Sequence, residues 1–194
     1  MRNRRVLTSA LVVAALAVAA PALGAGKGSY SDPSGDAKSG PDVTRVKVAK
    51  LKTGWLQFTL TVANRKSNIQ VGDVVYVAVD SDRKPSTGIN VTHSTDPKQQ
   101  GPDYAFTMYY AGGSSLTSGG FRLVTGQQPK SIAKPSTIKE TAKAGTFTIA
   151  VSPKLFRPPK RFSFFVWAYT NPSSSGNLDF APNTGVYAYT TPKK

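Results

Sequence analysis

The chain has 194 residues, with 25 Lys and Arg against 10 Asp and Glu, one His and no Cys. This length suits one domain, or two small ones, and is enough to bury a hydrophobic core. The lack of Cys excludes disulfides, thiolate metal sites and a cysteine nucleophile, and a single His excludes multi-histidine zinc sites.

Residues 1–25 have the pattern of a secretory signal peptide. Three arginines stand within the first five residues, an apolar run covers 6–20, and small residues follow Pro21. The run of about 15 residues is shorter than the roughly 20 that a membrane span needs, although an uncleaved anchor is the alternative. We therefore predict cleavage after residue 25, a secreted domain over 26–194 with no transmembrane segment, and a formal charge that falls from +15 to +12.

The remaining sequence predicts an all-β fold, because short apolar runs recur between clusters of Gly, Pro, Ser and Asp. The expected strands, in chain order, cover residues 45–48, 56–62, 74–79, 104–110, 121–124, 146–151, 162–169 and 186–189. About eight or nine strands at this spacing predict a single antiparallel β-sandwich, of jelly-roll or immunoglobulin-like type. Residues 111–120 and 126–136 are expected to be loops, and 153–156 could form one helical turn.

Three of these strands carry more specific signals. In 56–62 apolar and polar residues alternate, which predicts one buried face, and Gly54 suggests a hairpin with the preceding strand. Residues 74–79 are apolar on both faces, as in a central strand. In 162–169 one face carries only apolar side chains, and Phe165, Trp167 and Tyr169 occupy the other.

The acidic residues are concentrated in turns. Asp commonly forms turns, so local turn chemistry is one explanation, and Asp179 also fits it. The other explanation is calcium, which takes six to eight oxygen ligands and is often held by carboxylates and carbonyls of loops. The candidate ligands are Asp32, Asp36, Asp42, Asp80, Asp82 and Asp103.

Four segments together resemble the DOMON-like domains related to family-nine carbohydrate-binding modules. They are Tyr30-Ser31-Asp32-Pro33-Ser34-Gly35-Asp36 with Pro41-Asp42-Val43-Thr44, Val77-Ala78-Val79-Asp80-Ser81-Asp82 with Pro85-Ser86-Thr87-Gly88, Gly101-Pro102-Asp103-Tyr104, and Leu178-Asp179-Phe180-Ala181-Pro182-Asn183. The resemblance spans about residues 30–190. It implies a β-sandwich in a family whose members include sugar binders, more distant haem binders and modules that hold structural calcium.

A sugar-binding function needs exposed aromatic rings with polar neighbours, because pyranose faces pack on Trp and Tyr. The alternative for each ring is burial in the core of the sandwich. The candidate ligand-binding residues are Trp55, Tyr76, Tyr109, Trp167 and Tyr169.

Haem and catalysis have weaker support. His93, the only His, and Met108, the only Met after residue 25, could form a His/Met haem ligand pair, but His93 stands in a polar loop. We therefore expect no haem. The only Glu, Glu140, stands alone and there is no Gly-x-Ser-x-Gly elbow, so we expect no enzyme activity.

Basic residues gather in two groups, at 47–52 and at 154–161. They predict attraction to anionic polymers without specific nucleic-acid recognition, or simply a solvated surface. The sequence thus predicts a secreted, non-catalytic module that binds carbohydrate or cell-envelope polymer and is stabilised by calcium. A nonspecific polyanion-binding surface protein is the first alternative, and a haem-binding or hydrolytic domain is the second.

Overall fold

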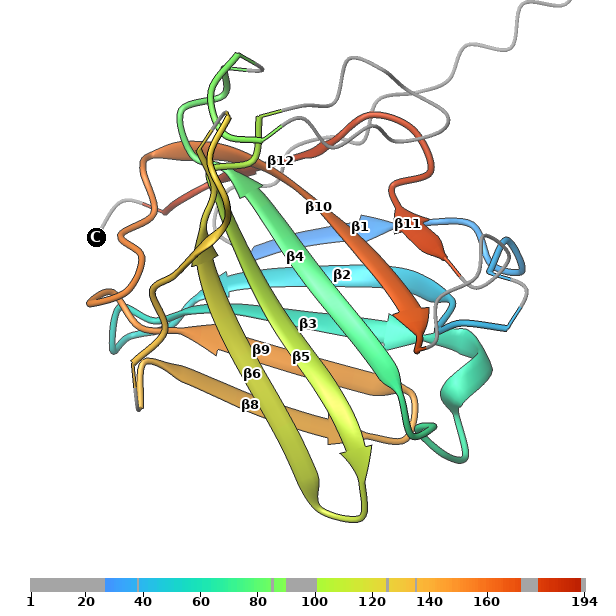
Figure 1. The fold of residues 1–194 in the computed structure, drawn as a ribbon. Helices are drawn as coiled ribbons and strands as arrows, with labels where there is room; N and C mark the ends of the chain where they lie inside the picture. The colour runs from blue at the N-terminus through green and yellow to red at the C-terminus, as the bar shows by residue number, and fades with distance from the viewer. Residues whose placement is uncertain are drawn as a thin grey trace, which may run out of the picture.

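The structure, a computed structural model, describes residues 27–37, 39–84, 86–89, 101–124, 126–134, 136–171 and 178–192. Two antiparallel sheets pack face to face and confirm the predicted β-sandwich (Figure 1). The predicted signal peptide lies outside the described residues. Within these ranges, no helix has the length and apolar character that a membrane crossing requires.

Each sheet has a simple strand order. The five-stranded sheet runs β1 (Lys27–Ser31), β2 (Val43–Lys50), β3 (Leu56–Val62), β9 (Thr146–Val151) and β8 (Ile138–Lys143). The seven-stranded sheet runs β11 (Asp179–Ala181), β10 (Arg161–Thr170), β4 (Asp73–Asp80), β5 (Tyr104–Gly112), β6 (Ser115–Arg122) and β7 (Lys130–Ser131), with β12 (Tyr187–Thr190) also paired to β10. In Figure 1 the strands of one sheet cross those of the other at a steep angle.

The inward faces of both sheets form one apolar core. Along β3 the alternate residues from Leu56 to Val62 are fully buried, as the sequence pattern predicts. On β10, Phe164 lies at the centre of this core, with ring-centroid distances of 5.1 Å to Tyr30 and 5.6 Å to Phe58. Burial of this many large side chains supplies the main driving force for folding.

The structure has more strands than expected, twelve in the described residues against about eight or nine. The expected loop at 111–120 is wrong, because β6 occupies most of it. Gly120 explains why the sequence pattern fails there: a Cβ atom at this position would lie 3.2 Å from side-chain carbons of Ile138 and Leu155. Strand β8 was not expected either, because its exposed residues are polar and it contributes only partly buried side chains to the core.

The shortest elements were also not predicted. Strands β1, β7 and β11 have two to five residues each and lack an apolar run. A 3-10 turn, η1 (Ala63–Arg65), follows β3 directly. The predicted turn at 153–156 is present as a single turn, in which the carbonyl of Ser152 accepts hydrogen bonds from Leu155 and Phe156.

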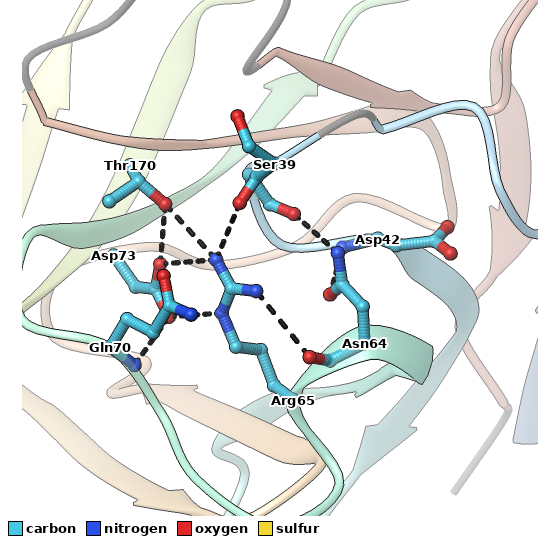
Figure 2. Close-up of polar contacts among 8 residues, drawn as sticks. Ser39, Asp42, Asn64, Arg65, Gln70, Asp73 and Thr170 are labelled. Carbon is cyan, nitrogen blue, oxygen red and sulfur yellow. Dashed lines mark hydrogen bonds and ion pairs between the residues drawn. The ribbon is translucent and has the colours of Figure 1, made fainter.

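Arg65 of η1 is the centre of a buried polar network (Figure 2). Its Nε donates to Asp73 at 2.8 Å, and its Nη2 donates to Asp73, Thr170 and the carbonyl of Ser39. Asp73 is fully buried and also accepts from Thr170 and from the backbone of Gln70. The network therefore joins both sheets to the loop that leads into β2.

Candidate functional site

An acidic cluster lies at the end of the sandwich where β11 meets the start of β2. Asp32 and Asp36 come from the loop after β1, and Asp179 comes from β11 of the other sheet. One carboxylate oxygen from each lies within 4.8 Å of the other two. We refer to these three residues, together with the adjoining Asp42, as the four-aspartate cluster.

Backbone hydrogen bonds fix the orientation of the cluster. The carboxylate of Asp179 accepts from the backbone of Val43 at 2.5 Å, and that of Asp42 accepts from Gly35 at 2.9 Å. Asn183 donates its backbone amide to Asp32 at 3.1 Å and its side-chain amide to Asp36. The cluster therefore links two chain segments that are distant in sequence, residues 32–43 and 179–183.

Three of the four carboxylates also have a buried oxygen without a hydrogen-bond partner. These oxygens belong to Asp32, Asp42 and Asp179, whose exposed fractions are 9%, 4% and 3%. Burial is the largest cause that raises the pKa of Asp32 and of Asp179 to about 7 each, and the charges of the neighbouring carboxylates contribute to the same rise. Unpaired buried carboxylates are strongly unfavourable unless they are protonated or bound to a cation.

The Arg65 network supports this cluster from one side. Asn64, next to Arg65, accepts from the backbone of Asp42 at 2.9 Å and donates to the carbonyl of Gly40 at 2.7 Å (Figure 2). Arg65 itself donates to the carbonyl of Ser39 at 2.9 Å. These contacts hold the backbone that places Asp42 at the cluster.

The other predicted ligands form a second acidic group. Asp80, Asp82 and Asp103 also bring carboxylate oxygens within 4.8 Å of one another. The turn after β4 supplies their hydrogen bonds: Arg83 donates to Asp80, Lys84 and Thr87 donate to Asp82, and Ser81 donates to Asp103. Burial, with the charges of the other two aspartates, raises the pKa of Asp80 to about 6.

The six predicted ligands thus lie in two places. Asp80 pairs with Ser163, whereas Asp179 pairs with Ala168 on the same strand, β10. Five residues of extended strand separate these positions by about 17 Å. Asp179 was not among the predicted ligands. A single Asp in a turn does not indicate that the fold brings it next to a loop about 140 residues earlier in the chain. The only signal in the sequence was its place in the C-terminal segment of the family resemblance.

The predicted aromatic residues divide between the two outer faces of the sandwich. Tyr76, Tyr109, Trp167 and Tyr169 occupy outward positions on the seven-stranded sheet. There Tyr76 stacks on Trp167 at 4.5 Å and lies parallel to Tyr169 at 6.1 Å. These rings cover part of one another's faces, which leaves less flat surface for a sugar than separate rings would offer.

Trp55 lies on the opposite side of the molecule, at the start of β3. It is half-buried, and the ammonium group of Lys139 stands 5.0 Å from the centre of its ring, a cation–π distance. A hollow of about 410 Å³ surrounds the ring and is lined by Gln57, Lys139, Thr141 and other residues of the same face. Trp55 therefore combines an aromatic ring with polar and basic neighbours.

The outer face of the five-stranded sheet is rich in threonine and basic residues. The register aligns Arg45, Thr61, Thr146 and Lys143 in one row across four strands. The next row holds Lys47, Thr59, Thr148 and Thr141. A third row places Ala150 between Gln57 and Lys139, and both of these line a hollow with Trp55. We refer to these outward side chains as the threonine-rich face.

The threonine-rich face carries basic side chains, and no acidic side chain of β2, β3, β8 or β9 points outward on it. Its four basic residues are exposed. Glu140, the one acidic residue in β2, β3, β8 and β9, falls in the inward register with Ile138 and Ala142, although it borders the hollow at Trp55. Two further hollows adjoin the first and include Lys47 on one side and Lys50, Lys52 and Arg157 on the other.

Of the two residues considered as haem ligands, the structure describes only Met108. Met108 is fully buried in the core on β5, and His93 lies outside the described residues.

Comparison of the chain with known protein families, curated proteins and solved structures finds no match. The resemblance to DOMON-like domains therefore remains a prediction from the sequence.

Proposed function

We propose that this protein is a secreted, non-catalytic module that binds an anionic polymer of the cell envelope. The polymer is a polysaccharide with negatively charged groups, either carboxylates or phosphates. The threonine-rich face is the proposed binding surface. The observation that carries the proposal is the row of Arg45, Thr61, Thr146 and Lys143, in which a basic side chain stands at each end of two hydroxyl side chains.

The dimensions of this row suit an extended polymer. Three strand spacings separate Arg45 from Lys143, a distance of about 14 Å. A chain with regularly spaced anionic groups can therefore contact both ends, while the threonine hydroxyls hydrogen-bond the groups between them. The three adjoining hollows share Gln57 or Leu51 and extend this surface beyond a single row.

Trp55 supports a sugar chain over a generic polyanion. Its ring stands at the edge of the same face, beside Gln57 and Lys139, and sugar rings pack on such a surface through their apolar C–H groups. The family resemblance points to the same class of ligand. Secretion rests on the pattern of residues 1–25, and mass spectrometry of the exported protein would locate the cleavage site.

The test compares two charge variants of the protein. Arg45→Glu with Lys143→Glu reverses both ends of the row, and should weaken binding to polygalacturonate at least tenfold, as measured by isothermal titration calorimetry. Lys130→Glu with Lys134→Glu is the matched control, because it changes the net charge equally at exposed positions in and after β7. It should leave the affinity within about twofold.

Two further measurements complete this test: the affinity for polygalacturonate at several salt concentrations, and the affinity for a neutral polymer. Binding should weaken with added salt, as expected when cations contact anionic groups, while Trp55→Ala should weaken it further at every salt concentration. Neutral dextran should bind far more weakly than polygalacturonate. Equal losses in the two charge variants would instead support a nonspecific basic surface, and no binding of either polymer by the wild-type protein would refute the proposal.

A further inference from the structure

We propose that the four-aspartate cluster is a calcium-binding site that joins the loop after β1 to β11. Carboxylate oxygens of Asp32, Asp36 and Asp179 lie within 4.8 Å of one another there, and Asp42 adjoins them through its hydrogen bond from Gly35. Three of the four carboxylates have a buried oxygen without a hydrogen-bond partner. This inference is independent of polymer binding, which concerns the outer face of the five-stranded sheet.

The carboxylates of the cluster have no cationic side chain as a partner among the described residues. The chain has 25 basic residues, yet the one ion pair recorded among the described residues is that of Arg65 with Asp73. Asp32 and Asp179 are each more than nine-tenths buried, and each has one oxygen that accepts a hydrogen bond and another, buried, that has no hydrogen-bond partner. A bound cation would supply the missing partner for both free oxygens.

The possible metal ligands in the cluster are all carboxylate oxygen atoms. Oxygen-only sites select hard cations, and calcium accepts six to eight such ligands in irregular arrangements. Magnesium requires a nearly regular octahedron and tends to keep its water molecules, so it suits this loop-built cluster less well. Carboxylate and water oxygens would complete the coordination of calcium.

The second acidic group differs from the four-aspartate cluster in the hydrogen bonds that its carboxylates accept. In that group each of Asp80, Asp82 and Asp103 accepts a hydrogen bond from the turn at 81–87, and none has a buried oxygen without a partner. Turn chemistry is sufficient to explain it. We therefore place the calcium site at the four-aspartate cluster alone.

The experiment measures calcium binding to the whole protein by titration calorimetry and thermal unfolding. Addition of calcium after EDTA should raise the Tm by several degrees, because a ligand bound only to the folded state stabilises it. Magnesium at the same concentration should have a much smaller effect. Terbium should bind in place of calcium and show luminescence sensitised by tyrosine, since the hydroxyl of Tyr187 donates to the carbonyl of Ser31, next to Asp32, at 3.1 Å.

Three variants make the test specific. Asp179→Asn should abolish the calcium-dependent rise in Tm, and Asp36→Asn, at an exposed position, should weaken calcium binding at least tenfold. Asp82→Asn, in the second acidic group, is the control and should bind calcium as the wild type does. The proposal is overturned if calcium does not bind, if magnesium binds equally well, or if Asp82→Asn loses binding while Asp36→Asn retains it.

Discussion

Replacement of Asp73 by asparagine should lower the free energy of unfolding by about 3–5 kcal/mol, because it leaves the buried Arg65 guanidinium without a counter-charge. Both side chains are almost completely inaccessible, at 4% for Arg65 and 0% for Asp73. When one partner of a buried ion pair is removed, the desolvation free energy of the remaining charge is no longer offset by an opposite charge. Urea unfolding at neutral pH, followed by tryptophan fluorescence, would measure the change.

The double variant Arg65→Met with Asp73→Asn provides the control for this result. If the uncompensated charge causes the loss, the double variant should be more stable than Asp73→Asn alone, because no buried charge remains. Thr170→Val, which removes one hydrogen-bond partner but no charge, should lower stability by only about 1 kcal/mol. A loss below about 1 kcal/mol for Asp73→Asn would contradict the role given to this ion pair.

In the absence of metal, the folded protein should become less stable as the pH rises from about 4 to about 7. Burial raises the pKa of both Asp32 and Asp179 to about 7, whereas an unfolded aspartate has a pKa near 3.9. Between these values the folded state binds more protons than the unfolded state, so the free energy of unfolding falls with rising pH. The total effect should be on the order of a few kcal/mol.

Denaturant unfolding in EDTA at several pH values would measure this dependence. Asp80, whose pKa is raised to about 6, also titrates in this range. Comparison with Asp179→Asn isolates the cluster, because the variant retains Asp80 and should show a shallower decline. If wild type and Asp179→Asn changed in parallel between pH 5 and 8, the raised pKa of Asp179 would be wrong.

The sequence predicts the inner strands of this fold well and its edges poorly. Strands β3, β4 and β10 bury long apolar side chains, so their alternation or continuous hydrophobicity is visible without a structure. Strand β8 carries Lys and Thr outward, and β6 depends on Gly120, which has no side chain to signal a buried position. Such strands form because neighbours in the sheet supply their hydrogen bonds, which is a property of tertiary structure.

The candidate calcium site could also be predicted only in part from the sequence, because one of its residues is brought there by tertiary structure. Asp32, Asp36 and Asp42 are close in sequence, so their association in one loop could be predicted. Asp179 joins them only because β11 pairs with β10 and lies against the start of β2, a contact that depends on the complete sandwich. The threonine-rich face likewise depends on strand register, which aligns Arg45 with Lys143 from strands nearly 100 residues apart.

The most direct test of the proposed binding surface uses the two tryptophans of the chain, because they lie on opposite faces of the sandwich. Each indole N–H gives a separate signal in a nitrogen-15 NMR spectrum, and Trp55→Phe assigns them. Titration with polygalacturonate should shift the Trp55 signal and leave that of Trp167 unchanged. A shift of Trp167 alone would move the binding site to the stacked aromatic rings of the seven-stranded sheet and contradict the account given for the threonine-rich face.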